Sequence, residues 1–213
     1  MFVEFLGLPA AGKTTTVKRL LDDPSIKVKT LRQIKRYPER NIIVLKDFIL
    51  GIWVLKIHFF RLFNLFITIN NTSRLKLLNI VLKIGLINST KLSYSDEVIL
   101  CDQLVLQDLW SILVRERSIN MKSLDWLLDF YSRIFIGPNL RVIYLDKDLE
   151  IVKKQYLNRI DHDDIFKDIP EDALGSEIYR ADKIIRSIIF HLPRQYIKST
   201  NNYDQLLAYI NES

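Results

Sequence analysis

Residues 2–21 read FVEFLGLPAAGKTTTVKRLL, and their pattern is the most informative in the chain. A short apolar run, residues 2–6, is interrupted only by Glu4. Residues 7–14 then match the pattern G-x-x-x-x-G-K-[ST] at every fixed position, and residues 15–21 continue with helical spacing of apolar side chains. The order strand, glycine-rich loop and helix predicts a loop that wraps around the phosphates of a bound nucleotide.

Each fixed position in this loop has a chemical reason. The glycines let the backbone approach phosphate oxygens, and the N–H groups at the start of the following helix point toward the anion. Lys13 adds positive charge at the β- and γ-phosphates, Thr14 offers its hydroxyl to Mg²⁺, and Thr15 offers a hydrogen bond to the α-phosphate. The predicted nucleotide-binding residues of the loop are Gly7, Pro9, Ala10, Ala11, Gly12, Lys13, Thr14 and Thr15.

Length and composition limit the class of protein to which the chain can belong. The 213 residues, 48% of them hydrophobic, suffice for one domain with its own core. The single cysteine, Cys101, excludes an intramolecular disulfide and a cysteine-rich zinc site. No basic, signal-like segment precedes the loop, so we expect a cytoplasmic protein, either free or peripheral to the inner face of a membrane. A net charge of +6 favours anionic partners but does not choose among phosphates, nucleic acids and membranes.

A basic cluster follows the second predicted strand, residues 26–31. In a parallel sheet this cluster would leave the strand on the same side as the loop, where ligands bind. Arg32 and Arg36 are therefore candidate substrate-binding residues, and the alternative is a solvated basic loop. The cluster consists of Arg32, Lys35, Arg36 and Arg40.

Residues 41–69 are markedly apolar, but charged residues interrupt them. The uncharged stretches 48–55 and 62–73 are shorter than the roughly 18–20 residues that a membrane-spanning helix needs. As one helix, the segment would carry a narrow polar stripe: Lys46, Asp47, His58, Arg61 and Asn64. A second apolar segment, residues 74–87, completes a predicted helical hairpin. Its wide apolar surface either packs in the core or meets a lipid, a lipid-like substrate or a partner helix.

Asp102 ends another apolar run, residues 97–101. In nucleotide-binding α/β sheets a carboxylate at this place lies near Mg²⁺ and the phosphates, where it holds a metal-bound water or accepts a proton. The alternative is that Asp102 caps the following helix, residues 104–117. Gln103 and Gln107 are candidate substrate contacts beside it.

The rest of the chain predicts a helix over 124–136, a strand over 141–145, a helix over 149–160, a helix over 177–190, a short strand over 195–198 and a helix over 203–210. Arg159 lies in a charged region, about 149–172, that could close over a transferring phosphate. The alternative is that its charges simply cover a solvated helix face.

This order of parts resembles the P-loop kinase group that includes thymidylate kinase. The resemblance implies an α/β fold, a three-layer α/β/α sandwich with a five-stranded parallel sheet, as one domain over 1–213. It also implies Mg-ATP on the loop and a lid over the acceptor, with Asp102 as the acid of the third strand and Arg159 as lid arginine. Ser199, Thr200 and Asn201 would lie near the adenine, with Thr200 as the nucleotide-binding candidate.

The chain departs from that group in three ways. Gln103 stands where nucleoside-monophosphate kinases commonly have arginine, the lid offers one clear arginine, and an apolar insertion at about 41–88 replaces the part that recognises the acceptor. The acceptor and the oligomeric state therefore stay open.

These features predict an ATP-dependent kinase that uses Mg²⁺, with Lys13, Asp102 and Arg159 as catalytic residues and Thr14 and Asp102 as metal-site residues. One alternative is an ATP-binding switch or adaptor whose helices, residues 41–87, contact a membrane or a partner. Another is a nucleic-acid 5′-end kinase, which draws on the positive net charge and on the basic cluster of residues 32–40. The chain has no Asn-Lys-x-Asp motif of the kind that reads guanine, which argues against a regulatory GTPase.

Overall fold

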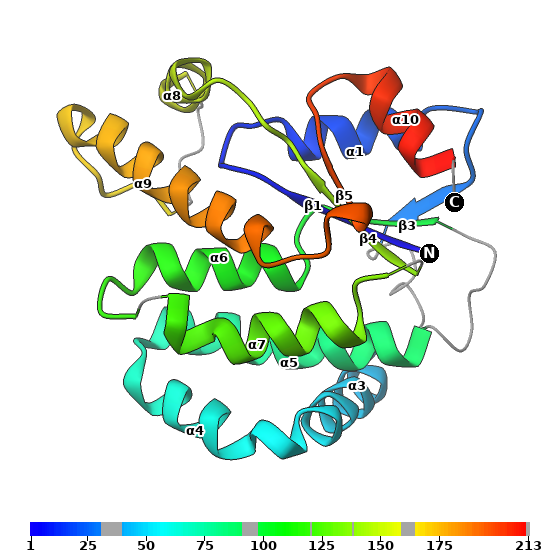
Figure 1. Cartoon of the computed structure of the whole chain (residues 1–213), viewed down its shortest axis with the longest axis vertical. Helices are drawn as coiled ribbons and strands as arrows, with labels where there is room; N and C mark the ends of the chain where they lie inside the picture. Colours follow the sequence, from blue (N-terminus) through cyan, green and yellow to red (C-terminus); the bar gives the residue numbers. More distant parts are fainter. Residues whose placement is uncertain (31–39, 91–97, 120, 138, 159–164, 212–213) are drawn as a thin grey trace.

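The computed structural model of the chain contains a five-stranded sheet surrounded by helices (Figure 1). It describes residues 1–30, 40–90, 98–119, 121–137, 139–158 and 165–211. The strands stand in the order β2-β3-β1-β4-β5 and every neighbouring pair is parallel. Their bounds are β1 Phe2–Leu6, β2 Val28–Thr30, β3 Val98–Cys101, β4 Leu140–Tyr144 and β5 Ile197–Ser199. The predicted five-stranded parallel sheet is confirmed.

The central strand is β1, which is buried along its whole length because strands flank it on both sides and helices cover both faces. Its residue Glu4 lies opposite Cys101 of β3, and Leu6 lies opposite Tyr144 of β4. This register brings the carboxyl ends of β1, β3 and β4 to the same edge of the sheet. The glycine-rich loop and Asp102 therefore leave the sheet side by side.

The described helices are α1 Lys13–Leu21, α3 Arg40–Val54, α4 Phe59–Thr68, α5 Asn71–Thr90, α6 Val105–Arg115, α7 Met121–Ile134, α8 Leu149–Leu157, α9 Glu171–Phe190 and α10 Tyr203–Asn211. Two short 3₁₀ turns are η1 Lys56–His58 and η2 Arg194–Tyr196. Most begin and end within a few residues of the predicted limits.

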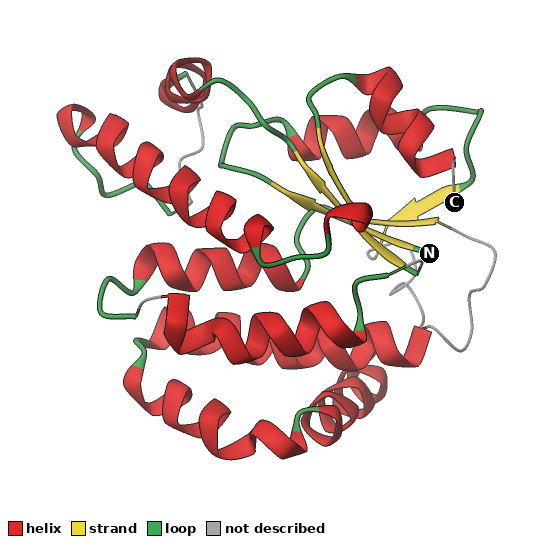
Figure 2. Cartoon of the chain, in the orientation of Figure 1, coloured by secondary structure: helices red, strands yellow, loops and turns green. Residues whose placement is uncertain are grey.

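Helices cover both faces of the sheet, as Figure 2 shows by secondary structure. Helices α1 and α10 lie on one face, where Tyr203 of α10 donates a hydrogen bond to Asp23 and stacks under Arg19. Helix α6 packs on β1 from the other face, with α9 beside it. The α/β fold with helices on both sides of the sheet is thus confirmed.

Residues 40–90, which we call the helical segment, add material beyond the α6 layer. Helix α5 packs on α6, and α3 packs on α5 in turn. At the α3–α5 crossing the two backbones nearly touch, because a Cβ at Gly51 would collide with the carbonyl of Val81 and a Cβ at Gly85 with the carbonyl of Asp47. Only glycine at both positions allows this approach.

The prediction of one continuous helix over 41–69 is wrong, since the chain breaks at η1 and α4 turns away from α3. The predicted polar stripe therefore does not form. Asp47 is buried on the α5 side, where Ser89 donates a hydrogen bond to it at 3.0 Å. His58 packs instead against the rings of Trp126 and Phe130 on α7.

Within the described residues, no single helix has both the length and the apolar character needed to cross a bilayer. Residues Leu45–Val54 and Phe59–Thr68 meet the length and composition requirement only as a pair, and the pair is bent by 114°.

Candidate nucleotide-binding site

The phosphate loop, residues 7–14, joins β1 to α1 and has two residues at positive φ. These are Ala10 at 63° and Gly12 at 98°. Such backbone turns successive N–H groups toward one side, which forms an anion-binding concavity. Helix α1 begins directly after Gly12, which has no capping side chain, and its first turn contains no acid. The start of α1 thus offers N–H groups and a positive dipole end to an anion.

Lys13 lies folded back over the loop. Its Nζ donates hydrogen bonds to the carbonyls of Gly7 at 2.6 Å and Leu8 at 2.9 Å. The ammonium group therefore lies at the loop, where a bound phosphate chain would meet it.

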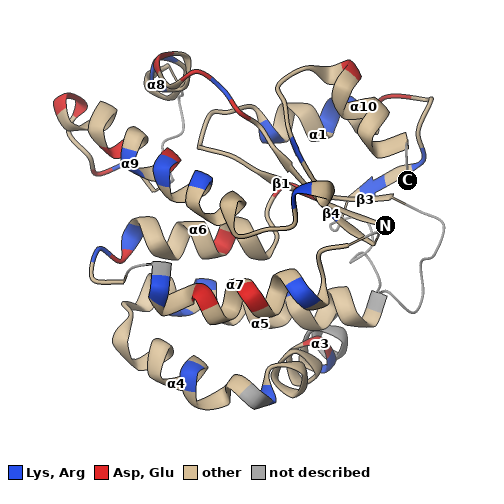
Figure 3. Cartoon of the chain, in the orientation of Figure 1, with Lys and Arg blue, Asp and Glu red and all other residues tan. Residues whose placement is uncertain are grey.

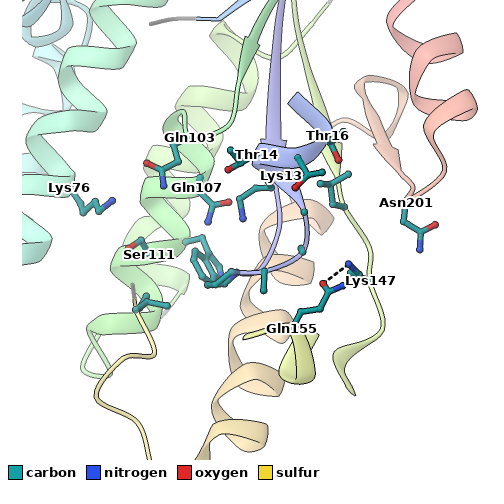
Figure 4. A pocket seen from close by; sticks show the side chains of 18 of the residues that line it. Lys13, Thr14, Thr16, Lys76, Gln103, Gln107, Ser111, Lys147, Gln155 and Asn201 are labelled. Carbon is teal, nitrogen blue, oxygen red and sulfur yellow. Dashed lines mark hydrogen bonds between the residues drawn. The ribbon is translucent and has the colours of Figure 1, made fainter. Parts of the chain in front are cut away.

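A cavity of about 900 Å³ opens above the loop, at the carboxyl ends of the strands (Figure 4). Residues 9–16 form one wall, and the opposite wall comes from the start and face of α6. Four cations line the cavity, and no acid from the described residues does. The charge favours an anionic ligand. The cations are Lys13, Lys76, Arg115 and Lys147, and the polar and aromatic side chains of the α6 wall are Gln103, Gln107, Trp110 and Ser111.

Gln107 connects the α6 wall to the phosphate loop. The N–H of Gly7 donates to its Oε1 at 3.3 Å. Trp110, one turn further along α6, is fixed by a hydrogen bond from its Nε1 to the carbonyl of Ala181 at 2.9 Å. Hydrogen bonds therefore fix the side chains of Gln107 and Trp110 in the wall that faces the loop.

Glu4 supports this wall from inside the sheet, a role that no motif in the sequence predicts. Its Oε1 accepts the backbone N–H groups of Leu106 at 2.7 Å and Gln107 at 3.1 Å, and Tyr131 of α7 donates to its Oε2 at 3.0 Å. A carboxylate from the central strand thus caps the N-terminus of α6. Through Gln107 it positions the first glycine of the loop.

Burial controls the charge of Glu4. The side chain is fully buried, and desolvation raises the pKa of its carboxyl from 4.5 to about 7, although the hydrogen bonds from Gln107 and Tyr131 and the charge of Lys83 act to lower it. Burial and the nearby Glu4 also raise the pKa of the Tyr131 hydroxyl. The Glu4 carboxyl therefore changes charge near neutral pH.

A buried carboxylate ties the helical segment to the α6 wall. Asp108 of α6 is almost fully buried and accepts hydrogen bonds from two lysines of α5, Lys83 at 2.5 Å and Lys76 at 3.2 Å. Lys83 also donates to the carbonyl of Leu104 at 3.3 Å. Lys76 reaches the cavity wall from this cluster, so α5 contributes directly to the site (Figure 4).

On the other side of the loop, β4 and its connection to α8 complete the cavity. Lys147 donates to Gln155 of α8 at 2.6 Å, and both line the cavity. Near the end of β4, the buried Asp182 of α9 accepts hydrogen bonds from Tyr144 at 2.7 Å and from Arg186 at 2.7 Å. Burial and the bond to Asp182 raise the pKa of the Tyr144 hydroxyl.

The predicted site residues are only partly brought together. Residues 9–15, Gln103 and Gln107 line the cavity, and Gly7 contacts Gln107. Asp102 lies half-buried between β3 and α6 but is not part of the cavity wall. The alternative that Asp102 caps α6 is wrong, because Leu104 precedes that helix and Glu4 accepts its N–H groups.

Thr200 also lies off the cavity wall. It is buried, donates to Gln205 at 3.0 Å and accepts the N–H of Asn202 at 3.0 Å, so its hydroxyl is used at the start of α10. The neighbouring Asn201 lines the cavity instead. Arg32, Arg36 and Arg159 lie outside the described residues.

The described residues contain no group of three or more His, Cys, Asp and Glu that could hold a metal ion. Mg²⁺ does not need such a group, since it is usually bound by one or two protein oxygens together with substrate phosphates and waters. The hydroxyl of Thr14, exposed on the cavity wall, fits that mode.

Solved structures share this fold. A deoxyadenosine kinase from M. mycoides with bound dATP aligns over 100% of both chains with a TM-score of 0.51 and 13% identity. The thymidylate kinase from Candida albicans aligns over 99% of this chain and 89% of that chain with a TM-score of 0.53 and 15% identity. The chain has the fold of the P-loop nucleotide-kinase-like proteins. No protein-family model and no curated protein sequence matches the chain.

The M. mycoides enzyme with bound dCMP and dCDP also aligns over 100% of both chains, with a TM-score of 0.50 and 13% identity. At these identities the likeness concerns the fold alone. The features specific to this chain lie in the loop, the α6 wall and the helical segment.

Proposed function

We propose that this protein is an ATP-dependent phosphotransferase that acts on a small or nucleotide-like acceptor. The observation that carries the proposal is a phosphate loop beside a large cavity that is lined by cations. Pockets for single ligands usually range over roughly 300–1,000 Å³, and this cavity lies near the upper end at about 900 Å³. The deoxyadenosine kinase from M. mycoides, which has the same fold, is known with bound dATP and with bound dCMP and dCDP.

The phosphate loop is assigned to the nucleotide. The N–H groups of residues 10–15 would bind phosphate oxygens, and Lys13 would neutralise the charge that spreads over the transferred group. Thr14 would hold Mg²⁺, which supplies charge neutralisation between the phosphates when bound. Asp102, at the end of β3, stays our candidate for holding a metal-bound water or accepting a proton, and Arg159 our candidate lid cation.

The acceptor is assigned to the α6 wall. Gln103 and Gln107 offer amide groups, and Trp110 offers an apolar ring, so the wall suits a polar molecule with a flat or apolar part. Lys76 and Arg115 lie on the same side and favour an acceptor that carries negative charge. Most of the work of such an enzyme is positioning and charge neutralisation.

The first test is nucleotide binding and phosphate transfer with Lys13→Ala. We expect transfer to fall by about 10²–10³ fold, as for the loss of one electrostatic contact to a transition state. The matched control is Lys18→Ala, which removes an exposed lysine of the same helix α1. Binding would be followed with a fluorescent ATP analogue, and transfer with radiolabelled ATP and a panel of acceptors.

Two outcomes would sink the proposal. One is a Lys13→Ala protein that binds and consumes ATP as the unmodified protein does. The other is a protein that binds no nucleoside triphosphate in the presence of Mg²⁺. A Gln103→Ala variant, which keeps the bond between Gln107 and Gly7, then locates the acceptor, because we expect it to raise the KM for the acceptor far more than the KM for ATP.

A further inference from the structure

Helices α3 and α4 present large apolar side chains to solvent. On α3 these are Leu45, Ile49, Ile52 and Trp53, and on α4 they are Phe59, Phe60, Phe63 and Ile67. Phe60 is 81% exposed, and Trp53 is 60% exposed. On each helix the spacing keeps the four side chains within about one third of the circumference. We call these eight residues the outer apolar face.

The opposite side of the same helices is attached to the protein, which fixes the direction of this face. Gly51 of α3 lies against α5, and Leu55, directly after α3, is buried. Leu65 is the buried residue of α4. His58, between the helices, packs on the rings of α7. Figure 1 shows α3 and α4 at the side of the molecule that lies away from the sheet. The outer face therefore has no partner among the described residues.

The charges around this face are all of one sign. Asp47 is the only acid between residues 41 and 90, and it is buried against Ser89. Lys46, Lys56 and Arg61 are exposed, and they form no ion pair within the described part of the chain. Lys56 lies over the ring of Trp53, with its Nζ 4.8 Å from the ring centre. In Figure 3 the α4 ribbon is tan with a blue segment and no red one.

We propose that the outer apolar face of α3 and α4 binds the surface of an anionic membrane. Apolar and aromatic side chains would enter the boundary between headgroups and acyl chains, and the flanking lysines and arginine would contact anionic headgroups. This is attachment by helices that lie on the bilayer, since α3 has only 15 residues and α4 only 10, and the protein holds both helices on their inner side.

Two features favour a lipid surface over a protein partner. The axes of α3 and α4 are bent by 114° at their junction and share one plane, so a flat surface can contact both helices. A single straight helix of a partner protein could follow only one of them. A second copy of the same face would bring Lys46, Lys56 and Arg61 together with their own copies, in a chain whose net charge is +6. An anionic bilayer complements that charge.

The test is co-sedimentation of the full-length protein with vesicles, and it needs no nucleotide, so it is independent of the kinase proposal. Vesicles of phosphatidylcholine are compared with vesicles that also contain phosphatidylglycerol. We expect sedimentation with the anionic vesicles, weaker sedimentation with the neutral ones, and a loss at high salt. Emission from Trp53 should shift to shorter wavelength on binding, and Trp53→Phe should remove that shift.

Two sets of variants locate the contact. Phe60→Gln/Phe63→Gln should weaken partitioning into anionic vesicles at least about tenfold. The matched control Tyr179→Gln/Phe190→Gln changes two equally exposed rings on α9 and should leave partitioning unchanged. Lys56→Gln/Arg61→Gln should weaken it about fivefold per charge, and Lys154→Gln/Lys183→Gln should not.

Three results would overturn the proposal. The first is that the unmodified protein does not sediment with anionic vesicles. The second is that the Phe60→Gln/Phe63→Gln variant and its α9 control lose vesicle partitioning equally. The third is a dimer in sedimentation equilibrium that Phe60→Gln/Phe63→Gln dissociates. In the last case a second copy covers the face. Because the changed side chains are exposed, circular dichroism melts of all variants should match that of the unmodified protein.

Discussion

The phosphate loop and the helical segment solve opposite problems with the same chain. The loop, residues 7–14, uses small residues so that polar backbone groups can reach a ligand, with Ala10 and Gly12 at positive φ. The helical segment, residues 40–90, uses small residues so that two backbones can reach each other, at Gly51 and Gly85. The role of a small residue therefore depends on what approaches it, which is an anion at the loop and another helix in the helical segment.

The largest effect we expect is on the helix crossing. Gly85→Ala should lower the free energy of unfolding by about 3 kcal/mol or more, because the new Cβ would meet the carbonyl of Asp47, which is backbone and cannot rotate away. The measurement is urea unfolding. The ATP-analogue affinity of the folded protein should change less than twofold, since the phosphate loop lies in the other region.

The control for this variant is Gly175→Ala in α9. The nearest atom to a Cβ there is the flexible Lys153 Nζ at 3.6 Å. Without a clash, replacing a helical glycine by alanine should raise stability by about 0.5–1 kcal/mol. If both variants unfold alike, then α3 does not approach α5 as closely as the structure has it.

The two regions also differ in how far the sequence predicts them. The loop and β1 come from one local motif, and the structure has both within a residue of the prediction. The role of Glu4 could not be predicted, since its partners Leu106 and Tyr131 lie more than 100 residues away and a charge in an apolar strand indicates only an interruption. Likewise, nothing local pairs Gly51 with Val81 or ends a helix at Val54.

The next prediction tests the support beneath the loop through its pH dependence. The folded-state pKa of Glu4 is raised from 4.5 to about 7, so the folded protein keeps a proton that the unfolded chain releases. The contribution of Glu4 to stability is therefore fully present below pH 4.5 and is lost as the pH rises toward 7. The loss amounts to about 3 kcal/mol.

Glu4→Gln removes this dependence while keeping an amide oxygen that can accept the N–H groups of α6. Unfolding free energies measured at about pH 5 and about pH 8 should differ by about 2.5 kcal/mol less in Glu4→Gln than in the unmodified protein. Glu150→Gln, at an exposed acid of α8, should keep the full difference. A variant with the unmodified slope would show that Glu4 is ionised in the folded protein throughout this range.

Asp108, with its partners Lys76 and Lys83, connects the two regions. Substitutions of the two lysines should have different effects on stability and on ligand binding. Lys83→Met leaves the buried Asp108 with one partner and should cost about 2 kcal/mol of unfolding free energy. Lys76→Met removes the longer and more exposed contact and should cost about 1 kcal/mol or less. Because Lys76 lines the cavity, its loss alone should weaken binding of inorganic pyrophosphate, measured by calorimetry.

The opposite result has a clear meaning. If Lys83→Met weakens pyrophosphate binding as much as Lys76→Met does, Asp108 and both lysines act as one unit, and the helical segment cannot be separated from the site.

The smallest effect belongs to the loop itself. Ala10 has φ at 63°, where a Cβ costs roughly 1 kcal/mol, so Ala10→Gly should raise the free energy of unfolding by about that amount. Ala11→Gly, at a buried neighbour without positive φ, should lower it instead. ATP-analogue affinity of Ala10→Gly should stay within about twofold, because its N–H keeps its direction. A tenfold loss would show that the Ala10 methyl group itself holds the loop in its binding shape. Small residues in this chain would then have a third role, beside letting a ligand approach the loop and letting two helices approach each other.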